Sequence, residues 1–121
     1  MPNVQNGTGS VLAQGVATTA AVAIYGPLAD TNKQVEVRGF VLNNEASSAT
    51  TITYGLGKAG STLGAAGTSQ GKTVAIGAAG TTTSIIDASE LEYMILGYGD
   101  YVWVQAGANM SVAYTLDGIV Y

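Results

Sequence analysis

The residues closest to a known catalytic pattern lie at positions 66–73 and read AGTSQGKT. With alanine in place of the first glycine, they match the phosphate-binding loop of nucleotide hydrolases. In that loop backbone N–H groups surround the phosphates, a lysine contacts the terminal ones and a threonine binds Mg²⁺. The loop needs a helix directly after it, because the helix N-terminus attracts the phosphates. Residues 74–77 favour a strand instead, so we do not expect nucleotide binding.

Glu90 and Glu92, which lie close to Asp87, are the second candidates for chemistry. Paired carboxylates can act as general acid and base or bind Ca²⁺. No loop with the ligand spacing of a calcium site surrounds them, so we interpret them as a solvated turn or as the rim of a protein contact. The chain contains no histidine and no cysteine, which removes the commonest general base, the commonest metal ligand and any thiolate. We therefore expect neither an enzyme, nor a metal site, nor a bound cofactor.

Four aromatic residues towards the C-terminus support a different hypothesis: Tyr93, Tyr98, Tyr101 and Trp103. Exposed aromatic rings stack on sugar rings, so a carbohydrate-binding module is one interpretation of this cluster. The alternative is packing in a core or an interface, where aromatic side chains bury a large area. Exposure of Tyr98, Tyr101 and Trp103 on one common face would favour the sugar platform.

Charge is scarce in this chain, at 10% of the residues against about 25% in a typical soluble domain. The net charge is −4, and the four basic residues, Lys33, Arg38, Lys58 and Lys72, are too scattered to neutralise a row of phosphates. We therefore expect no nucleic-acid partner. The sequence predicts no membrane-spanning segment and no signal peptide, and hence no membrane partner. A surface rich in glycine, alanine, serine and threonine favours a protein that functions in contact with other proteins.

Apolar and polar residues alternate over short stretches of the chain, as in strands that are buried on one face. Turn residues separate about seven or eight such stretches, and no helix of crossover length lies between them. The sequence therefore predicts an all-β protein, a single antiparallel β-sandwich or jelly roll over residues 18–121. Strands are expected at residues 18–25, 35–43, 50–56, 72–76, 81–87, 101–106 and 110–121, with a long loop at 57–71 and a short helical turn or extended segment at 88–96.

Residues 33–55 organise this predicted sandwich, because they read as two strands joined by a polar turn, which indicates a hairpin. Gly39 stands within the first strand, where a glycine often marks a bulge or a close approach of two backbones. After Gly39 both faces of the strand are apolar. Phe40 and Leu42 therefore need a second covering surface, either the other sheet or another subunit.

Residues 1–17 are expected to form a flexible N-terminal arm, because the first ten are polar, uncharged and contain glycine. A frayed end is the simplest interpretation, and residues 11–16 could begin a first short strand. The alternative is an arm that becomes ordered only on a neighbouring molecule. The predicted protein-contact residues are Val4, Val11, Leu12 and Val16 of the arm, together with Phe40 and Leu42.

Five segments follow one another in an order that is typical of a known group: residues 22–25 (VAIY), 35–44 (VEVRGFVLNN), 49–54 (ATTITY), 99–104 (GDYVWV) and 112–115 (VAYT). A strand with an apolar–aromatic end precedes a valine-rich strand that ends in asparagine. A turn of serine, alanine and threonine and a threonine-rich strand follow, and later a glycine–aspartate turn enters the next strand. Over residues 20–121 this order resembles the small β-sandwich proteins of tailed-bacteriophage virions.

The resemblance implies a structural virion protein without catalytic residues. Its leading form is a capsid decoration, or cement, protein: a homotrimer on the capsid exterior that bridges subunits of the major capsid protein after synthesis in the host cytoplasm. A component of the phage tail or of a head fibre is the alternative within the same group. A carbohydrate-binding module is the alternative outside it.

Overall fold

The computed structural model describes residues 10–63, 69–108 and 111–121, and nearly all of the regular structure in these ranges is β. This confirms the all-β prediction. The elements are β1 (Ser10–Val16), β2 (Val22–Tyr25), β3 (Val35–Asn44), β4 (Thr50–Gly57), β5 (Ser69–Ile76), β6 (Ile85–Asp87), the 3₁₀ helix η1 (Ser89–Leu91), β7 (Ile95–Leu96), β8 (Tyr101–Ala106) and β9 (Val112–Val120).

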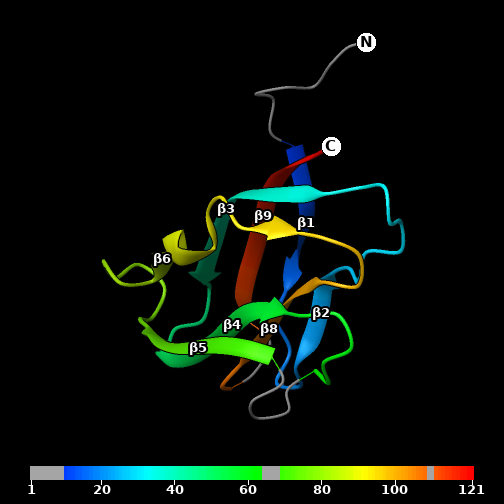
Figure 1. Cartoon of the computed structure of the whole chain (residues 1–121). Helices are drawn as coiled ribbons and strands as arrows, with labels where there is room; N and C mark the ends of the chain where they lie inside the picture. The colour runs from blue at the N-terminus through cyan, green and yellow to red at the C-terminus, as the bar shows by residue number, and fades with distance from the viewer. Residues whose placement is uncertain (1–9, 64–68, 109–110) are drawn as a thin grey trace.

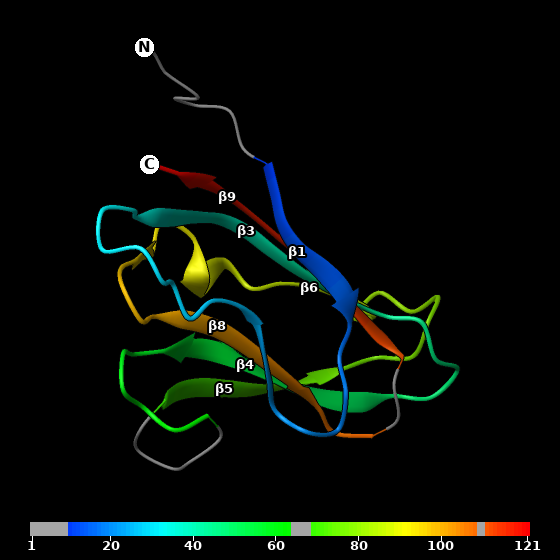
Figure 2. The ribbon, with the colours of Figure 1, turned by 90° about the vertical axis from the view of Figure 1, so that its right-hand side faces the viewer.

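The strands form two antiparallel sheets that pack face to face as a β-sandwich (Figures 1 and 2). The first sheet has the order β1-β9-β3-β6, with β7 also paired to β3, and the second has the order β2-β8-β4-β5. Strands β1 to β4 alternate between the two sheets, and β8 and β9 do the same. This winding is the double Greek key of a jelly roll.

Strands β3 and β4 do not form the predicted hairpin. Strand β3 pairs with β9, β6 and β7 in the first sheet, whereas β4 pairs with β5 and β8 in the second. The two strands instead face each other across the core, where the rings of Phe40 and Tyr54 meet edge to face with centroids 5.8 Å apart. A hairpin would place these large side chains on one sheet and leave them in need of a cover, whereas opposite layers bury both at once.

Gly39 lies at a β-bulge, one of the two features expected of a glycine in this strand. The register between β3 and β9 shifts between Val37 and Gly39. Because the bulge reverses the alternation, Phe40 and Leu42 turn to the same side as Val35 and Val37, and all four are buried. The covering surface that Phe40 and Leu42 need is therefore the opposite sheet of the same chain.

The core lies between the two sheets and is built from their inward-facing side chains. Burying a large apolar side chain contributes about 1.5–3 kcal/mol, so this layer supplies most of the driving force for folding. Its main members are Val35, Val37, Phe40, Leu42, Leu96, Val112 and Leu116 of the first sheet and Ile52, Tyr54, Ile76, Val102, Val104 and Ala106 of the second.

A buried asparagine holds the crossing from β3 to β4. Asn44 Nδ2 donates hydrogen bonds of 2.9 Å to the carbonyl oxygens of Ser48 and Gly77, and Oδ1 accepts one of 2.9 Å from the N–H of Ala46. Because the amide is fully buried, these bonds satisfy groups that water cannot reach. One side chain thus ties the turn after β3 to the segment after β5.

Residues 10–16 are not part of a free arm, which corrects the predicted domain boundary at residue 18. They form β1, which runs antiparallel to β9 from Ser10 opposite Gly118 to Val16 opposite Ala113. Leu12 is half-buried against the core. The short strand that residues 11–16 could begin is therefore present, and its pairing partner is β9. The rest of the expected arm, including Val4, lies outside the described residues.

The segment before β7 combines both structures expected for residues 88–96, since η1 is followed by the extended pair of β7. The strand expected at 81–87 is shorter than predicted and covers only Ile85–Asp87. Thr81 Oγ1 donates to the carbonyl oxygen of Ala78, and Ser84 Oγ donates to that of Thr81. These local side-chain bonds favour a turn over a strand.

Candidate functional site

The predicted contact residues have different positions in the fold. Val11 and Val16 are exposed on β1, Val16 with 47% of its surface accessible, whereas Leu12 is half-buried. Phe40 and Leu42 have no accessible surface. They cannot touch another molecule while the chain is folded, so their assignment as protein contacts is corrected to core.

The outer face of the first sheet is not covered by any other part of the described chain. The pairing register places Val16 of β1 beside Ala113 of β9. The same row continues through Asn43 of β3 to Ile85 of β6, which is 60% exposed. Val41 projects from this face in the adjacent row. We call the exposed aliphatic side chains of this sheet the contact face: Val11, Val16, Val41 and Ile85.

Val41 and Ile85 were not among the predicted contact residues. Strict alternation places Val41 on the same side as Val37, towards the core, but the bulge at Gly39 reverses the order. The sequence carried a signal for this reversal, because the two largest apolar side chains of the strand, Phe40 and Leu42, occupy alternate positions after Gly39. Ile85 was placed in a predicted strand, but the sequence did not show which side of that strand faces the core. In the structure its neighbour Ile86 packs against the core.

A polar cluster lies at one end of the same face. The guanidinium carbon of Arg38 is 5.2 Å from the ring centroid of Tyr93, and Nη1 is 3.6 Å from Glu36 Oε1. The Tyr121 hydroxyl donates a 2.9 Å hydrogen bond to the same carboxylate oxygen, which raises the pKa of the tyrosine. Exposed ion pairs of this kind contribute little to stability, so we interpret the cluster as a polar rim of the contact face.

The aromatic residues do not form the exposed platform that the sugar hypothesis requires. Tyr101 and Trp103 are buried, Trp103 with 4% of its surface accessible, whereas Tyr98 is exposed in the loop before β8. Both buried rings lie against glycine positions. A Cβ at Gly57 would come within 1.9 Å of the Tyr101 ring, and one at Gly71 within 2.5 Å of the Trp103 ring. These rings serve the packing of the second sheet.

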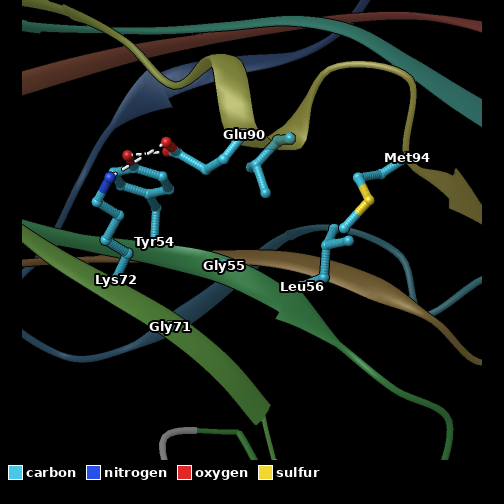
Figure 3. Close-up of a pocket in the computed structure, with 8 residues that line it drawn as sticks. Tyr54, Gly55, Leu56, Gly71, Lys72, Glu90 and Met94 are labelled. Carbon is cyan, nitrogen blue, oxygen red and sulfur yellow. Dashed lines mark hydrogen bonds and ion pairs between the residues drawn. The ribbon is translucent and has the colours of Figure 1, made fainter.

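A cavity of about 250 Å³ opens beside β5, between the second sheet and η1 (Figure 3). At its polar end the Tyr54 hydroxyl donates a hydrogen bond to Glu90 Oε1, while Lys72 Nζ lies 3.3 Å from Glu90 Oε2. Lys72 belongs to the extended strand β5, whereas the lysine of a phosphate-binding loop would precede a helix. Figure 3 shows Leu56 and Met94 at the other, apolar end. The lining consists of Tyr54, Gly55, Leu56, Gly71, Lys72, Glu90, Leu91 and Met94.

The polar end of the cavity couples two ionisable groups. Burial, together with the hydrogen bond to Glu90 and its negative charge, raises the pKa of Tyr54. The hydrogen bond from Tyr54 is the main cause that lowers the pKa of Glu90, with Lys72 acting in the same direction and burial acting against it. The carboxylate is therefore held in its charged form and joins η1 to β4 and β5.

We expect this contact to make stability depend on pH. The folded pKa of Glu90 lies below its ordinary value of 4.5, so the stabilisation is fully present above that value and is lost as the pH falls through the folded pKa. Glu90→Gln should therefore be less stable than the wild type at about pH 7, and the gap should narrow at about pH 3. Urea unfolding followed by the fluorescence of Trp103, the single tryptophan, measures both values.

Glu92→Gln is the matched control, since it removes an equal charge nearby without removing the Tyr54 hydrogen bond. A gap between wild type and Glu90→Gln that stays constant across this pH range would contradict the assignment.

The remaining carboxylates give no sign of a metal centre. Within residues 10–63, 69–108 and 111–121, no group of three or more aspartate, glutamate, histidine or cysteine side chains could hold a metal ion. Asp100 has a structural role: its carboxylate accepts 3.0 Å hydrogen bonds from the N–H groups of Ala59 and Gly97. These bonds hold the turn that leads into β8. No helix in the described part of the chain has the length and apolar character needed to cross a membrane.

Comparison of the chain with known protein families, with curated proteins and with solved structures gave no match.

Proposed function

We propose that this chain is a non-enzymatic structural protein of a phage virion, most specifically a capsid decoration protein that bridges subunits of the major capsid protein. The observation that supports this proposal best is the contact face, an open sheet surface with exposed aliphatic side chains, in which Asp87 lies opposite Val41 and Asp117 opposite Val11. Such a surface is stabilised by burial against another protein. The sequence resemblance supplies the kind of partner and the location on the capsid exterior.

The general properties of the chain favour the same proposal. The sequence lacks histidine and cysteine, and the ionisable groups at the cavity bind each other instead of being directed at open space. The jelly roll is found in viral capsid proteins and also in lectins, so the fold alone does not choose between them. The burial of Tyr101 and Trp103 weighs against the lectin-like alternative.

The test is a double substitution on the contact face, Val16→Asp with Ile85→Asp. Both side chains are exposed, so the chain should still fold, but burying two carboxylates against a capsid would be costly. We expect binding to undecorated capsids of the phage that encodes the chain to weaken about 100-fold or more, measured by co-sedimentation.

The control is Tyr98→Asp, which adds a charge at an equally exposed aromatic side chain outside the contact face. Circular dichroism and Trp103 fluorescence establish that each variant is folded. Unchanged capsid binding by a folded double variant would refute the assignment of this face, and an absence of binding by the wild type would refute the function.

A further inference from the structure

Strand β5 forms a long, open edge of the second sheet. It pairs with β4 alone, over eight consecutive residue pairs without a register shift. The other edge strands of the described structure are shorter or irregular: β1 and β2 each contain a register shift, and β6 and β7 have three and two residues. Regular, unprotected edges are templates for the addition of a further strand.

The pairing pattern shows which backbone groups of β5 point outwards. The N–H of Gly107 donates to the carbonyl of Thr51. In an antiparallel sheet, alternate residues of a strand direct their N–H and C=O groups to the same neighbour. Every second residue of β4 from Thr51 onwards therefore bonds to β8, and the residues between them bond to β5. Across the ladder, Lys72 and Val74 therefore bond to β4, while the N–H and C=O groups of residues 71, 73 and 75 point away from the sheet. The N–H of Gly77, the next residue in this series, donates to Thr83, which fixes the end of the open segment.

The open segment lacks the features that normally prevent edge-to-edge pairing. Residues 71–75 contain no proline and a single charge, that of Lys72. Its ammonium group lies 3.3 Å from the Glu90 carboxylate of the same chain, so the charge is largely neutralised. The residues whose backbone groups point outwards, Gly71, Thr73 and Ala75, have small side chains and are exposed.

We propose that the occupant of this edge is β5 of a second copy of the chain, paired antiparallel about a two-fold axis at Thr73. This register uses the whole open segment, because it places Gly71 opposite Ala75 of the second copy and Thr73 opposite its own counterpart. In each of these pairs both residues direct their backbone groups outwards, as a hydrogen-bonded antiparallel pair requires. The pattern is self-complementary, which is the condition for a two-fold interface.

The cavity supports the same arrangement. In this register Lys72 lies opposite Val74 of the second copy, on the inner side of the extended sheet. Val74 of the second copy then lies beside the polar end of the cavity, where Lys72 and Tyr54 both contact Glu90. The open side of the cavity would be covered by an aliphatic side chain, and the Lys72–Glu90 pair would be less accessible to water.

The two-fold axis stands perpendicular to the sheet, as it does between antiparallel strands in general. The contact faces of both copies therefore point to the same side of the dimer. This inference does not rest on the proposed function, because the edge belongs to the second sheet and the contact face to the first. It differs from the homotrimer that the sequence resemblance implies, and the mass in solution distinguishes the two.

The first test is sedimentation equilibrium of the full chain. We expect twice the mass of one chain for the wild type, and a dissociation constant raised about 100-fold or more in Thr73→Lys, where two ammonium groups would meet at the axis. Thr51→Lys is the matched control, because it adds the same charge at an exposed position of β4 away from the edge. The contact-face double variant should remain dimeric, which separates this inference from the proposed function.

The second test is a cross-link at the same position. The chain has no cysteine, so Thr73→Cys introduces one thiol only. Directly opposed residues of a hydrogen-bonded antiparallel pair have Cα atoms about 5.5 Å apart, which is within the range of a disulfide. Oxidation should give a covalent dimer for Thr73→Cys and none for Thr51→Cys. A monomeric or trimeric wild type, or equal cross-linking of the two variants, would overturn the proposal.

Discussion

Replacing Phe40 by alanine should lower the free energy of unfolding by about 3–5 kcal/mol, the usual loss for a fully buried phenylalanine. The ring has no accessible surface and packs edge to face on Tyr54 of the opposite sheet. The substitution removes this contact between the two layers and leaves a cavity at the centre of the core. Urea denaturation monitored by Trp103 fluorescence measures the loss.

Val41→Ala is the matched control, because Val41 follows Phe40 on the same strand and points outwards. We expect it to change the free energy of unfolding by less than about 1 kcal/mol. The two variants together test whether Phe40 is a core residue, since replacing an intermolecular contact residue would weaken assembly and leave the free energy of unfolding nearly unchanged. Loss of assembly in Phe40→Ala at unchanged stability would restore Phe40 as a residue of an intermolecular contact.

The substitution Asn44→Ala should cost about 2–4 kcal/mol, although it removes only a few atoms. It leaves the carbonyl groups of Ser48 and Gly77 and the N–H of Ala46 without the partners that they have in the folded chain. Because Asn44 is fully buried, water reaches these groups only if the turns open. Thermal unfolding and hydrogen exchange at Ala46 measure the loss.

Asn43→Ala is the control, because it is the same substitution at the preceding residue of the strand. The side chain of Asn43 lies on the outer face of the sheet, between those of Ala113 and Ile85. Asn43→Ala should leave the exchange at Ala46 unchanged. Equal effects of the two substitutions would show that the amide bonds of Asn44 are not what holds the crossing.

Alternation and turn residues were sufficient to predict the fold class, because each strand carries its own pattern. The strand at 101–106 was predicted with its bounds, since Val102 and Val104 alternate with large side chains between two glycine-containing turns. Pairing was not predictable in the same way. The polar turn after β3 is compatible with a hairpin or with a crossing between the two sheets. The contact between the rings of Phe40 and Tyr54, which bury each other from opposite sheets, decides for the crossing.

Two residues of the contact face, Val11 and Val16, were among the predicted contact residues, and their exposure leaves that assignment a prediction. Val11 and Val16 were identified because they are apolar residues in a weakly patterned stretch, whereas Val41 was missed because one inserted residue reverses the faces of a strand. The Tyr54–Glu90–Lys72 cluster was not predicted, since its members come from β4, η1 and β5 and meet only in the folded chain. Tyrosine in a strand and glutamate in a turn carry no signal of a hydrogen bond between them.

The position of β9 between β1 and β3 has a consequence for biosynthesis. The first sheet joins residues 10–16 to residues 112–120, so β9, one of its two inner strands, is synthesised after the other strands of the described structure. Until β9 is available, β1 has no strand to pair with, and β3 is bonded only to β6 and β7 along its other edge. Contacts between the two ends of a chain are slow to form, because closing so large a loop costs entropy before any contact repays it. We therefore expect the nascent chain to be vulnerable to aggregation and proteolysis until β9 has been made, and a truncation within β9 to detach β1 from the rest of the first sheet.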